Sequence, residues 1–232
     1  MTFAEELVRA AQPEPIETHP FVMQVRSGEA SRDAIRSFAL HIASATESFT
    51  RSLYAVLSVC TDVRARQSFI GNVLEEEGAI AFTPGSGVTF NEARRHPAMA
   101  RRFTRAAGID DREIDAFQVG PPNWFGRQIA ARNWIGPFAY IAVGTEANIP
   151  PTYRLLIPAL AERYGFSEAD LEFLIEHVTA DDRHALDGAL LIESIATTET
   201  ARQQALEGAR RGGRGWWEIL RRHVAVGTGV SA

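Results

Sequence analysis

The segment from Ser31 to Cys60 places the strongest constraint on the fold, because it contains neither glycine nor proline. Ser31 is a residue type favoured where a helix begins. Apolar residues recur within the segment at three- and four-residue steps, the spacing that puts side chains on one face of an α-helix. We therefore predict one long amphipathic helix, with an apolar face made by Phe38, Ile42, Ala45, Phe49 and Leu53.

The rest of the chain also has helical character. A second helix is predicted from Asp62 to about Phe82, where the sequence TPGSG ends it. The sequence ARRGGRG near residue 212 predicts a flexible joint, followed by a short amphipathic helix with the sequence WWEILRRHV. No alternating strand pattern is bounded by hairpin turns, so we predict an all-α fold. Further helices are predicted at about residues 91–107, 110–117, 124–148, 152–164 and 168–209.

These segments predict a single helical domain of about seven to eight helices over residues 1–226, with a disordered tail at 227–232. The 232 residues are 45% hydrophobic, which is enough to form the core of an ordinary globular domain. The 24 basic and 29 acidic residues give a net charge of −5, which argues against a nucleic-acid partner.

The sequence also indicates the compartment. Cys60 has no second cysteine to pair with, as is typical of proteins in a reducing cytoplasm. The chain contains no run of about twenty uncharged apolar residues, the length needed to span a bilayer. Its first residues, MTFAEELVRAAQPEP, lack the basic start and apolar core of a signal peptide. We expect a cytoplasmic protein with no membrane partner.

The sequence EHVTADDRHAL carries a group of side chains that could bind metal. His177, Asp181 and His184 stand at positions i, i+4 and i+7, which lie on one narrow stripe of an α-helix. Two imidazoles and a carboxylate bind first-row metals well, notably iron, manganese and zinc. A solvated polar face would have the same spacing.

Three other segments contribute candidate ligands. Glu146 lies among apolar neighbours in FAYIAVGTEANIPP, so its carboxylate must be exposed, paired or bound to a metal. The sequence NVLEEEG supplies Glu75, Glu76 and Glu77, of which one is expected to face inward and two to face water. His96 opens the helical run HPAMARRFTRAAGI, with a proline well placed in its first turn. Taken alone, a histidine at this position is usually a surface or cap residue.

Together these segments resemble the heme-oxygenase-like diiron oxidases and oxygenases. The family pattern is N-x-x-D/E-E-x-G, then a histidine that opens an apolar helix, a glutamate in a mid-chain apolar helix, and H-x3-D-x2-H. The resemblance extends from about His19 to Trp217, and the segments follow the family order. It implies a six-residue metal site made by Glu76, His96, Glu146, His177, Asp181 and His184.

The resemblance further implies a heme-oxygenase-like helical bundle that holds two Fe(II) ions per chain and uses O2 as co-substrate, without heme or nucleotide. Family members convert small amino acids, amines, fatty acids and related precursors by desaturation, C–C cleavage or N-oxygenation. A homodimer is also implied, and an external electron donor is compatible with this chemistry. We therefore expect a nonheme diiron oxidoreductase that acts on a small amino-acid-derived, amine or related precursor in specialised metabolism, including natural product biosynthesis.

The pattern departs from the family in one place. The family usually brings its first histidine within about one to three turns of the first glutamate, whereas twenty residues separate Glu76 from His96 here. If Glu76 is not the inward carboxylate, Glu75 or Glu77 replaces it, because adjacent helix positions differ by about 100°.

Three side chains are predicted to bind the substrate. Glu47 lies off the apolar stripe of the long helix, although a solvent-facing position is the commoner reason for a glutamate there. Tyr153 follows Glu146 by seven residues, but two intervening prolines weaken the argument from helical spacing. Arg154 could pair with a substrate carboxylate or lie on the surface.

Two other functions compete with the diiron hypothesis. The first is a metal-free oxidase or a hydrolase on the same fold. Thiaminase-type hydrolases use a cysteine nucleophile, whereas Cys60 lies away from the corresponding mid-chain segment and is interpreted as a buried thiol. The second is a non-catalytic protein that docks a partner through Trp216 and Trp217. Of the remaining histidines, His19 is predicted to be a cap or packing residue, and His41 and His223 are predicted to face solvent.

Overall fold

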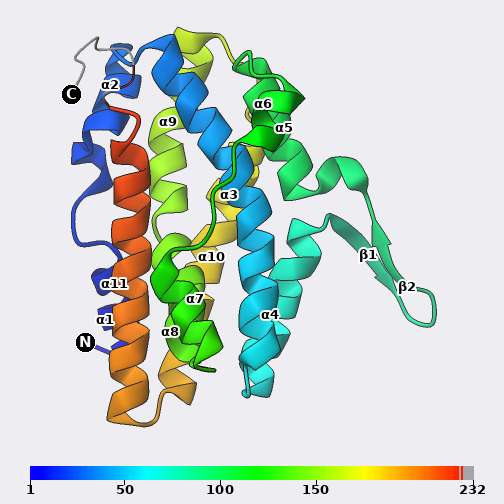
Figure 1. The fold of residues 1–232 in the computed structure, drawn as a ribbon, viewed down its shortest axis with the longest axis vertical. Coiled ribbons are helices and arrows are strands. Elements are labelled where there is room, and N and C mark those ends of the chain that lie inside the picture. Colours follow the sequence, from blue (N-terminus) through cyan, green and yellow to red (C-terminus); the bar gives the residue numbers. More distant parts are fainter. Residues whose placement is uncertain (225, 227–232) are drawn as a thin grey trace.

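The computed structural model describes residues 1–224 and 226, without the side chains of residues 179–183. The predicted tail at 227–232 lies outside this part. The described chain is a bundle of α-helices from which one β-hairpin protrudes (Figure 1). The helices are α1 (Phe3–Ala11), α2 (Pro20–Ser27), α3 (Arg32–Val59), α4 (Val63–Glu76), α5 (His96–Ala106), α6 (Asp111–Ala116), α7 (Asn123–Ala130), α8 (Ile135–Ala139), α9 (Ile149–Tyr164), α10 (Glu172–Ile195) and α11 (Glu199–Arg221).

The long helix predicted from Ser31 to Cys60 is confirmed as α3. The hydroxyl of Ser31 accepts a hydrogen bond from the backbone N–H of Ala34 at 3.0 Å and so caps the helix start. Phe38 and Leu53, both on the predicted apolar stripe, are fully buried. The helix therefore contributes to the core along most of its length.

The all-α prediction is wrong at one β-hairpin, and the helix predicted over residues 62–82 is too long for the same reason. Helix α4 ends at Glu76, and strands β1 (Ala79–Thr83) and β2 (Gly87–Phe90) form an antiparallel hairpin that stands away from the bundle (Figure 1). Ile80, Phe82 and Phe90 are exposed on it. Because neither face of the hairpin is buried in the core, it shows no alternation of apolar and polar residues.

The helical segments in the second half of the chain are more broken than predicted, so a total of seven to eight helices was too low. The segment predicted as one helix over 124–148 consists of α7, α8 and a π-helix, η3 (Tyr140–Thr145). The segment predicted over 168–209 ends at Ile195, and Thr198 caps the start of α11.

The ARRGGRG sequence is part of α11, so the prediction of a flexible joint is wrong. Its glycines allow neighbouring backbones to approach closely. A Cβ added at Gly212 would lie 2.4 Å from the carbonyl oxygen of Tyr140, and one at Gly213 would lie 1.8 Å from that of Ala11. The glycines are therefore required by packing between helices.

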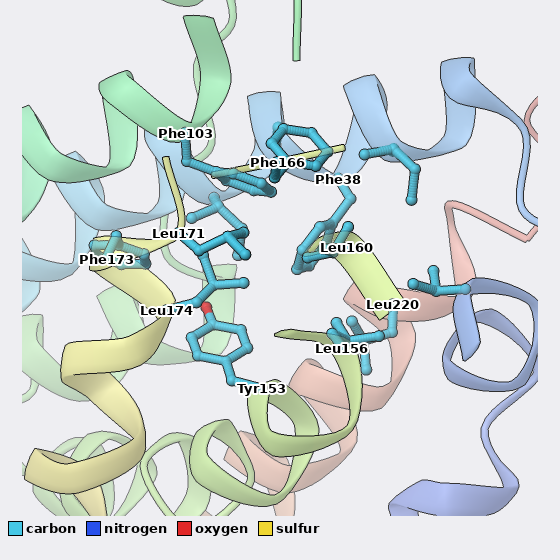
Figure 2. Packing of buried hydrophobic residues seen from close by; sticks show 14 of the residues in the cluster. Phe38, Phe103, Tyr153, Leu156, Leu160, Phe166, Leu171, Phe173, Leu174 and Leu220 are labelled. Atoms are coloured by element: carbon cyan, nitrogen blue, oxygen red, sulfur yellow. The ribbon is translucent and has the colours of Figure 1, made fainter. Parts of the chain in front are cut away.

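Two hydrophobic clusters form the core. The first includes the aromatic and leucine side chains in Figure 2, where the Tyr153 ring projects from α9 towards α10. The second includes Leu53, Phe69 and Phe138, with the rings of Phe69 and Phe138 stacked. Over the residues that the structure describes, no helix has the length and apolar content required to cross a bilayer.

Candidate metal centre

A cavity inside the bundle brings together side chains from seven segments of the chain. It contains about 650 Å³ of space not filled by atoms, including its open side. Helices α3, α4, α5, α9, α10 and α11 and the π-helix η3 contribute to its walls. Its polar lining consists of Thr46, Asn72, Glu75, Glu76, His96, Thr145, Glu146, Tyr153, His177 and His184, and its apolar lining includes Ile42, Phe49, Ile149, Phe173 and Trp216.

Glu76, His96 and His177 form the centre of this polar group. Each offers one ligand atom, these atoms all lie within 4.8 Å of one another, and all three residues are buried. Two ligands of one first-row metal, each bound at about 2.1 Å, are separated by no more than about 4 Å. Small side-chain adjustments would therefore allow these residues to share a metal ion.

The β-hairpin explains the long gap between Glu76 and His96. After α4 ends at Glu76, the chain forms the hairpin of β1 and β2 and then begins α5 at His96. The backbone N–H of Asn91 donates to the carbonyl of Gly78 at 2.9 Å, and this hydrogen bond joins the two ends of the hairpin. The imidazole Nδ1 of His96 consequently lies 2.8 Å from Oε1 of Glu76. The insertion thus preserves the contact between the two residues.

A hydrogen bond determines which nitrogen of His177 is available as a ligand. Nδ1 lies 2.7 Å from the carbonyl oxygen of Phe173, one turn earlier in α10. A carbonyl can only accept, so Nδ1 carries the proton, and the lone pair of the neutral ring is on Nε2. Orientation by a backbone carbonyl is typical of metal-binding histidines.

Glu146 directly follows the π-helix η3 and is 3% exposed. Its Oε1 accepts a hydrogen bond from Nδ2 of Asn72 at 3.2 Å. A π-helix inserts an extra residue into a helical turn and is frequent at functional sites. The sequence predicted Glu146 within a continuous helix and gave no sign of this widened turn.

His184 and Glu75 lie at a more open edge of the cavity. Nε2 of His184 is 3.3 Å from Oε2 of Glu75, and their side chains are 24% and 53% exposed. Glu77, the other alternative carboxylate, pairs with Arg95 at 3.0 Å. Of the three adjacent glutamates, Glu76 is therefore the buried one. Asp181 is among the residues whose side chains lie outside the described part.

The protonation of His96 reflects its negative surroundings. Burial lowers its pKa, but the charge of Glu76 and the contacts with Glu176 outweigh burial and raise the pKa to about 10. The second oxygen of Glu76, Oε2, is buried without a hydrogen-bond partner in the described structure. A buried carboxylate oxygen in this state is costly, and a metal cation would satisfy it. The chemistry of this donor set therefore fits a metal ion.

The predicted substrate-binding residues have different positions. Tyr153 is buried and lines the cavity. Glu47 does not line it but points to Arg101, 3.9 Å away, because it is offset by about 100° from its neighbour Thr46, which faces the cavity. Arg154 is exposed and donates to the carbonyl of Val178 at 3.4 Å, outside the cavity lining.

The remaining histidines, Trp216 and Cys60 lie in the interior of the bundle. His41 and His223 are buried, not solvent-facing, at 2% exposure each. His19 is confirmed as a cap, because its Nδ1 accepts from the N–H of Phe21. Trp216 is not an exposed anchor: it is buried, donates to Thr152 at 2.9 Å and lines the cavity. Cys60 is confirmed as a buried thiol.

Glu176 contacts His96 and was not predicted from the sequence. Its Oε1 lies 3.9 Å from Nε2 of His96, and its Oε2 lies 2.8 Å from Arg94. Contact with His96 lowers its pKa, burial opposes this effect, and the charge of Arg94 reinforces it. Its position directly before His177 was the only signal in the sequence.

Comparison with known proteins agrees with this fold. A TenA homologue from Pseudomonas syringae pv. tomato superposes with a TM-score of 0.73 at 14% identity, covering 96% of this chain and 92% of that protein. A domain from Shewanella denitrificans, described as having a heme oxygenase-like fold, gives a TM-score of 0.65 at 16% identity, covering 94% and 89%. The chain is thus a helical protein of heme-oxygenase-like fold with a buried group of glutamates and histidines.

Sequence comparison identifies the family. Residues 36–217 match the family described as iron-containing redox enzymes, and the chain belongs to this family. A protein of Chlamydia muridarum named 4-aminobenzoate synthase is 25% identical over 220 residues, covering 90% of this chain and 85% of the relative. A protein of the same name from Nitrosomonas europaea is 23% identical over 241 residues, covering 94% and 89%.

Proposed function

We propose that this protein is a nonheme diiron oxidase or oxygenase that uses O2 to convert a small organic substrate. The observation that carries the proposal is the buried group of Glu76, His96 and His177, whose ligand atoms lie within 4.8 Å of one another. Glu146 and His184 line the same cavity. In this proposal the two irons are held by Glu76, His96, Glu146, His177, Asp181 and His184.

Two bound ferrous ions would supply the electrons and the open coordination positions needed to react with O2. The chain's own residues hold the ligands in place. The Phe173 carbonyl keeps the proton of His177 on Nδ1, and the Asn72 amide orients Glu146. The side chains of Phe49, Ile149 and Trp216 give the cavity an apolar lining, which would limit the access of water to the bound metals.

The lining of the cavity supports a small substrate with an apolar part. Tyr153, Phe173 and Trp216 give it aromatic walls beside the carboxylates and imidazoles. Relatives that cover most of the chain are named 4-aminobenzoate synthase, after an aromatic amine product. We infer a small amino-acid-derived, amine or related aromatic precursor, with Tyr153 contacting it. A homodimer and an external electron donor remain predictions from the family resemblance.

Anaerobic ferrous titration of the metal-free protein tests the proposal. About two irons per chain, and a transient visible absorption band after oxygen is added, are the expected result. The variant His177→Ala should lose both. The matched control is His41→Ala, which removes another buried imidazole that does not line the cavity. It should bind iron as the wild type does.

A wild-type protein that binds no stoichiometric iron would contradict the proposal and favour a metal-free oxidase or hydrolase on the same fold. Equal iron loss in both variants would point to general unfolding, and circular dichroism of each variant separates that outcome from loss of a ligand.

A further inference from the structure

A second pocket lies against another face of α11. Trp216 of this helix lines the candidate metal cavity, whereas its neighbours Gly215 and Ile219 line the second pocket. The segment between α6 and α7 and the π-helix η3 also contribute to its walls, with Val119 and Tyr140 among the lining residues. The pocket contains about 1030 Å³ of space not filled by atoms, including its open side.

A buried imidazole with an unused nitrogen lines this pocket. His41 of α3 is 2% exposed, and its Nε2 has no hydrogen-bond partner in the described structure. Burial, reinforced by the charge of Arg222, lowers the pKa of His41 to about 4. The ring is therefore neutral at pH 7 and can donate one hydrogen bond from Nε2. A buried nitrogen without a hydrogen-bond partner lowers the stability of the fold, and a ligand that accepted its hydrogen bond would offset that cost.

The edge of the pocket carries a net positive charge. Arg211 is bound to Glu207 at 2.6 Å and covers the ring of Trp124, with 5.0 Å from its guanidinium carbon to the ring centre. Glu218 also lines the pocket, and it pairs at 3.6 Å with Arg221, which is not part of the lining. The three arginines of the lining therefore exceed its two glutamates by one charge.

The remaining two guanidinium groups of the lining belong to Arg214 and Arg222. Both are exposed, and neither has an ion pair among the described residues. A guanidinium group is suited to recognising a carboxylate, because it can donate two parallel hydrogen bonds to the two oxygens. Trp124 and Ile219 provide apolar surface beside them.

We propose that this pocket binds a small carboxylic acid with a flat apolar body. Arg214 and Arg222 recognise the carboxylate, His41 donates a hydrogen bond from the floor, and Trp124 contacts the apolar body. The proposal concerns a site separate from the metal cavity and does not depend on the chemistry proposed there.

Calorimetric titration of the metal-free protein with benzoate, and with benzamide as its uncharged counterpart, tests this site. Benzoate should bind at least about tenfold more tightly than benzamide. The double variant Arg214→Gln/Arg222→Gln should weaken benzoate binding by about tenfold or more. The matched control Arg26→Gln/Arg112→Gln removes two exposed arginines outside the pocket and should leave the affinity within about twofold.

The variant His41→Phe should also weaken benzoate binding, and the arginine variant keeps the test decisive if His41→Phe fails to fold. The proposal would be overturned by no benzoate binding by the wild type at about 10 mM, by equal affinity for benzamide, or by an unchanged affinity in the double arginine variant. Loss of benzoate binding in His177→Ala would place the carboxylate in the metal cavity and would also overturn it.

Discussion

At the scale of single residues, His96 couples metal binding to protons. In the metal-free protein its pKa is about 10, so the ring carries a proton at neutral pH. A metal ligand must be deprotonated, and binding through this ring must therefore release the proton. We expect Zn²⁺, used as a redox-inert probe, to release about one proton from His96 per chain at pH 7 and to bind more tightly as the pH rises. Calorimetry in buffers of different ionisation enthalpy measures the release.

The same group predicts a pH dependence of stability in the metal-free protein. Its folded pKa of about 10 lies above the ordinary value of 6.5, so protonated His96 favours the folded state. This contribution is fully present below pH 6.5 and is lost as the pH rises towards 10. The free energy of unfolding should therefore fall with rising pH in this window, and it should fall less steeply in His96→Gln. An unchanged slope would show that His96 is not the group responsible.

Asn72 is predicted to act through Glu146. Its amide donates to the carboxylate at 3.2 Å, and removal of such an orienting group typically weakens metal binding by about 10- to 100-fold. We expect this loss in Asn72→Ala, measured by competition with a chromophoric chelator. Asn123→Ala, which truncates an exposed asparagine of α7, is the matched control and should bind metal normally. Equal affinities of the two variants would contradict a positioning role.

At the scale of elements, the hairpin determines where His96 lies. Gly78 has a φ of +75°, and a Cβ there would lie 2.5 Å from the carbonyl oxygen of Asn91 and 2.8 Å from the backbone nitrogen of Arg95. The variant Gly78→Ala must therefore move the segment that leads into α5. We expect a destabilisation of about 2 kcal/mol or more together with weaker metal binding.

Gly85 provides the control for this prediction. It has a similar φ of +83°, but a Cβ there meets nothing within 4 Å. Gly85→Ala should cost only the backbone strain, about 1 kcal/mol, and should leave metal binding unchanged. Urea unfolding and chelator competition measure both quantities, and similar losses of metal affinity in the two variants would show that the contact at Gly78 is unimportant.

At the scale of the whole molecule, local patterns predicted the helices but not their interruptions. The stripe that begins at Phe38 predicted α3 because one face of that helix is buried along its length. The hairpin was missed because its residues are exposed on both faces and give no periodic signal. The sequence ARRGGRG was misinterpreted because glycine supports both flexible joints and close helix packing, and only the partner backbones at Tyr140 and Ala11 distinguish them.

The part of the candidate site that lies on one helix was predictable from the sequence, and the contacts between helices were not. The spacing of His177 and His184 indicates a shared helix face, which requires only local geometry. The contact between His96 and Glu76, twenty residues apart, depends on how the intervening hairpin folds, and no local pattern in the sequence indicates that. The exclusion of Glu47 from the cavity depends on which side of α3 faces its neighbours, which tertiary packing decides.

The distribution of the candidate ligands also predicts how metal affects the stability of the whole protein. Glu76, His96 and His177 lie on α4, α5 and α10, so one bound ion would link two neighbouring helices to a third that is distant in sequence. A ligand that binds only the folded state stabilises it by about 2.7 kcal/mol at 100 times its dissociation constant. Thermal unfolding should therefore shift upward on addition of Mn²⁺ and return on addition of a chelator. The shift should be absent in His177→Ala, whereas a metal-induced shift of equal size in that variant would mean that the ion binds elsewhere.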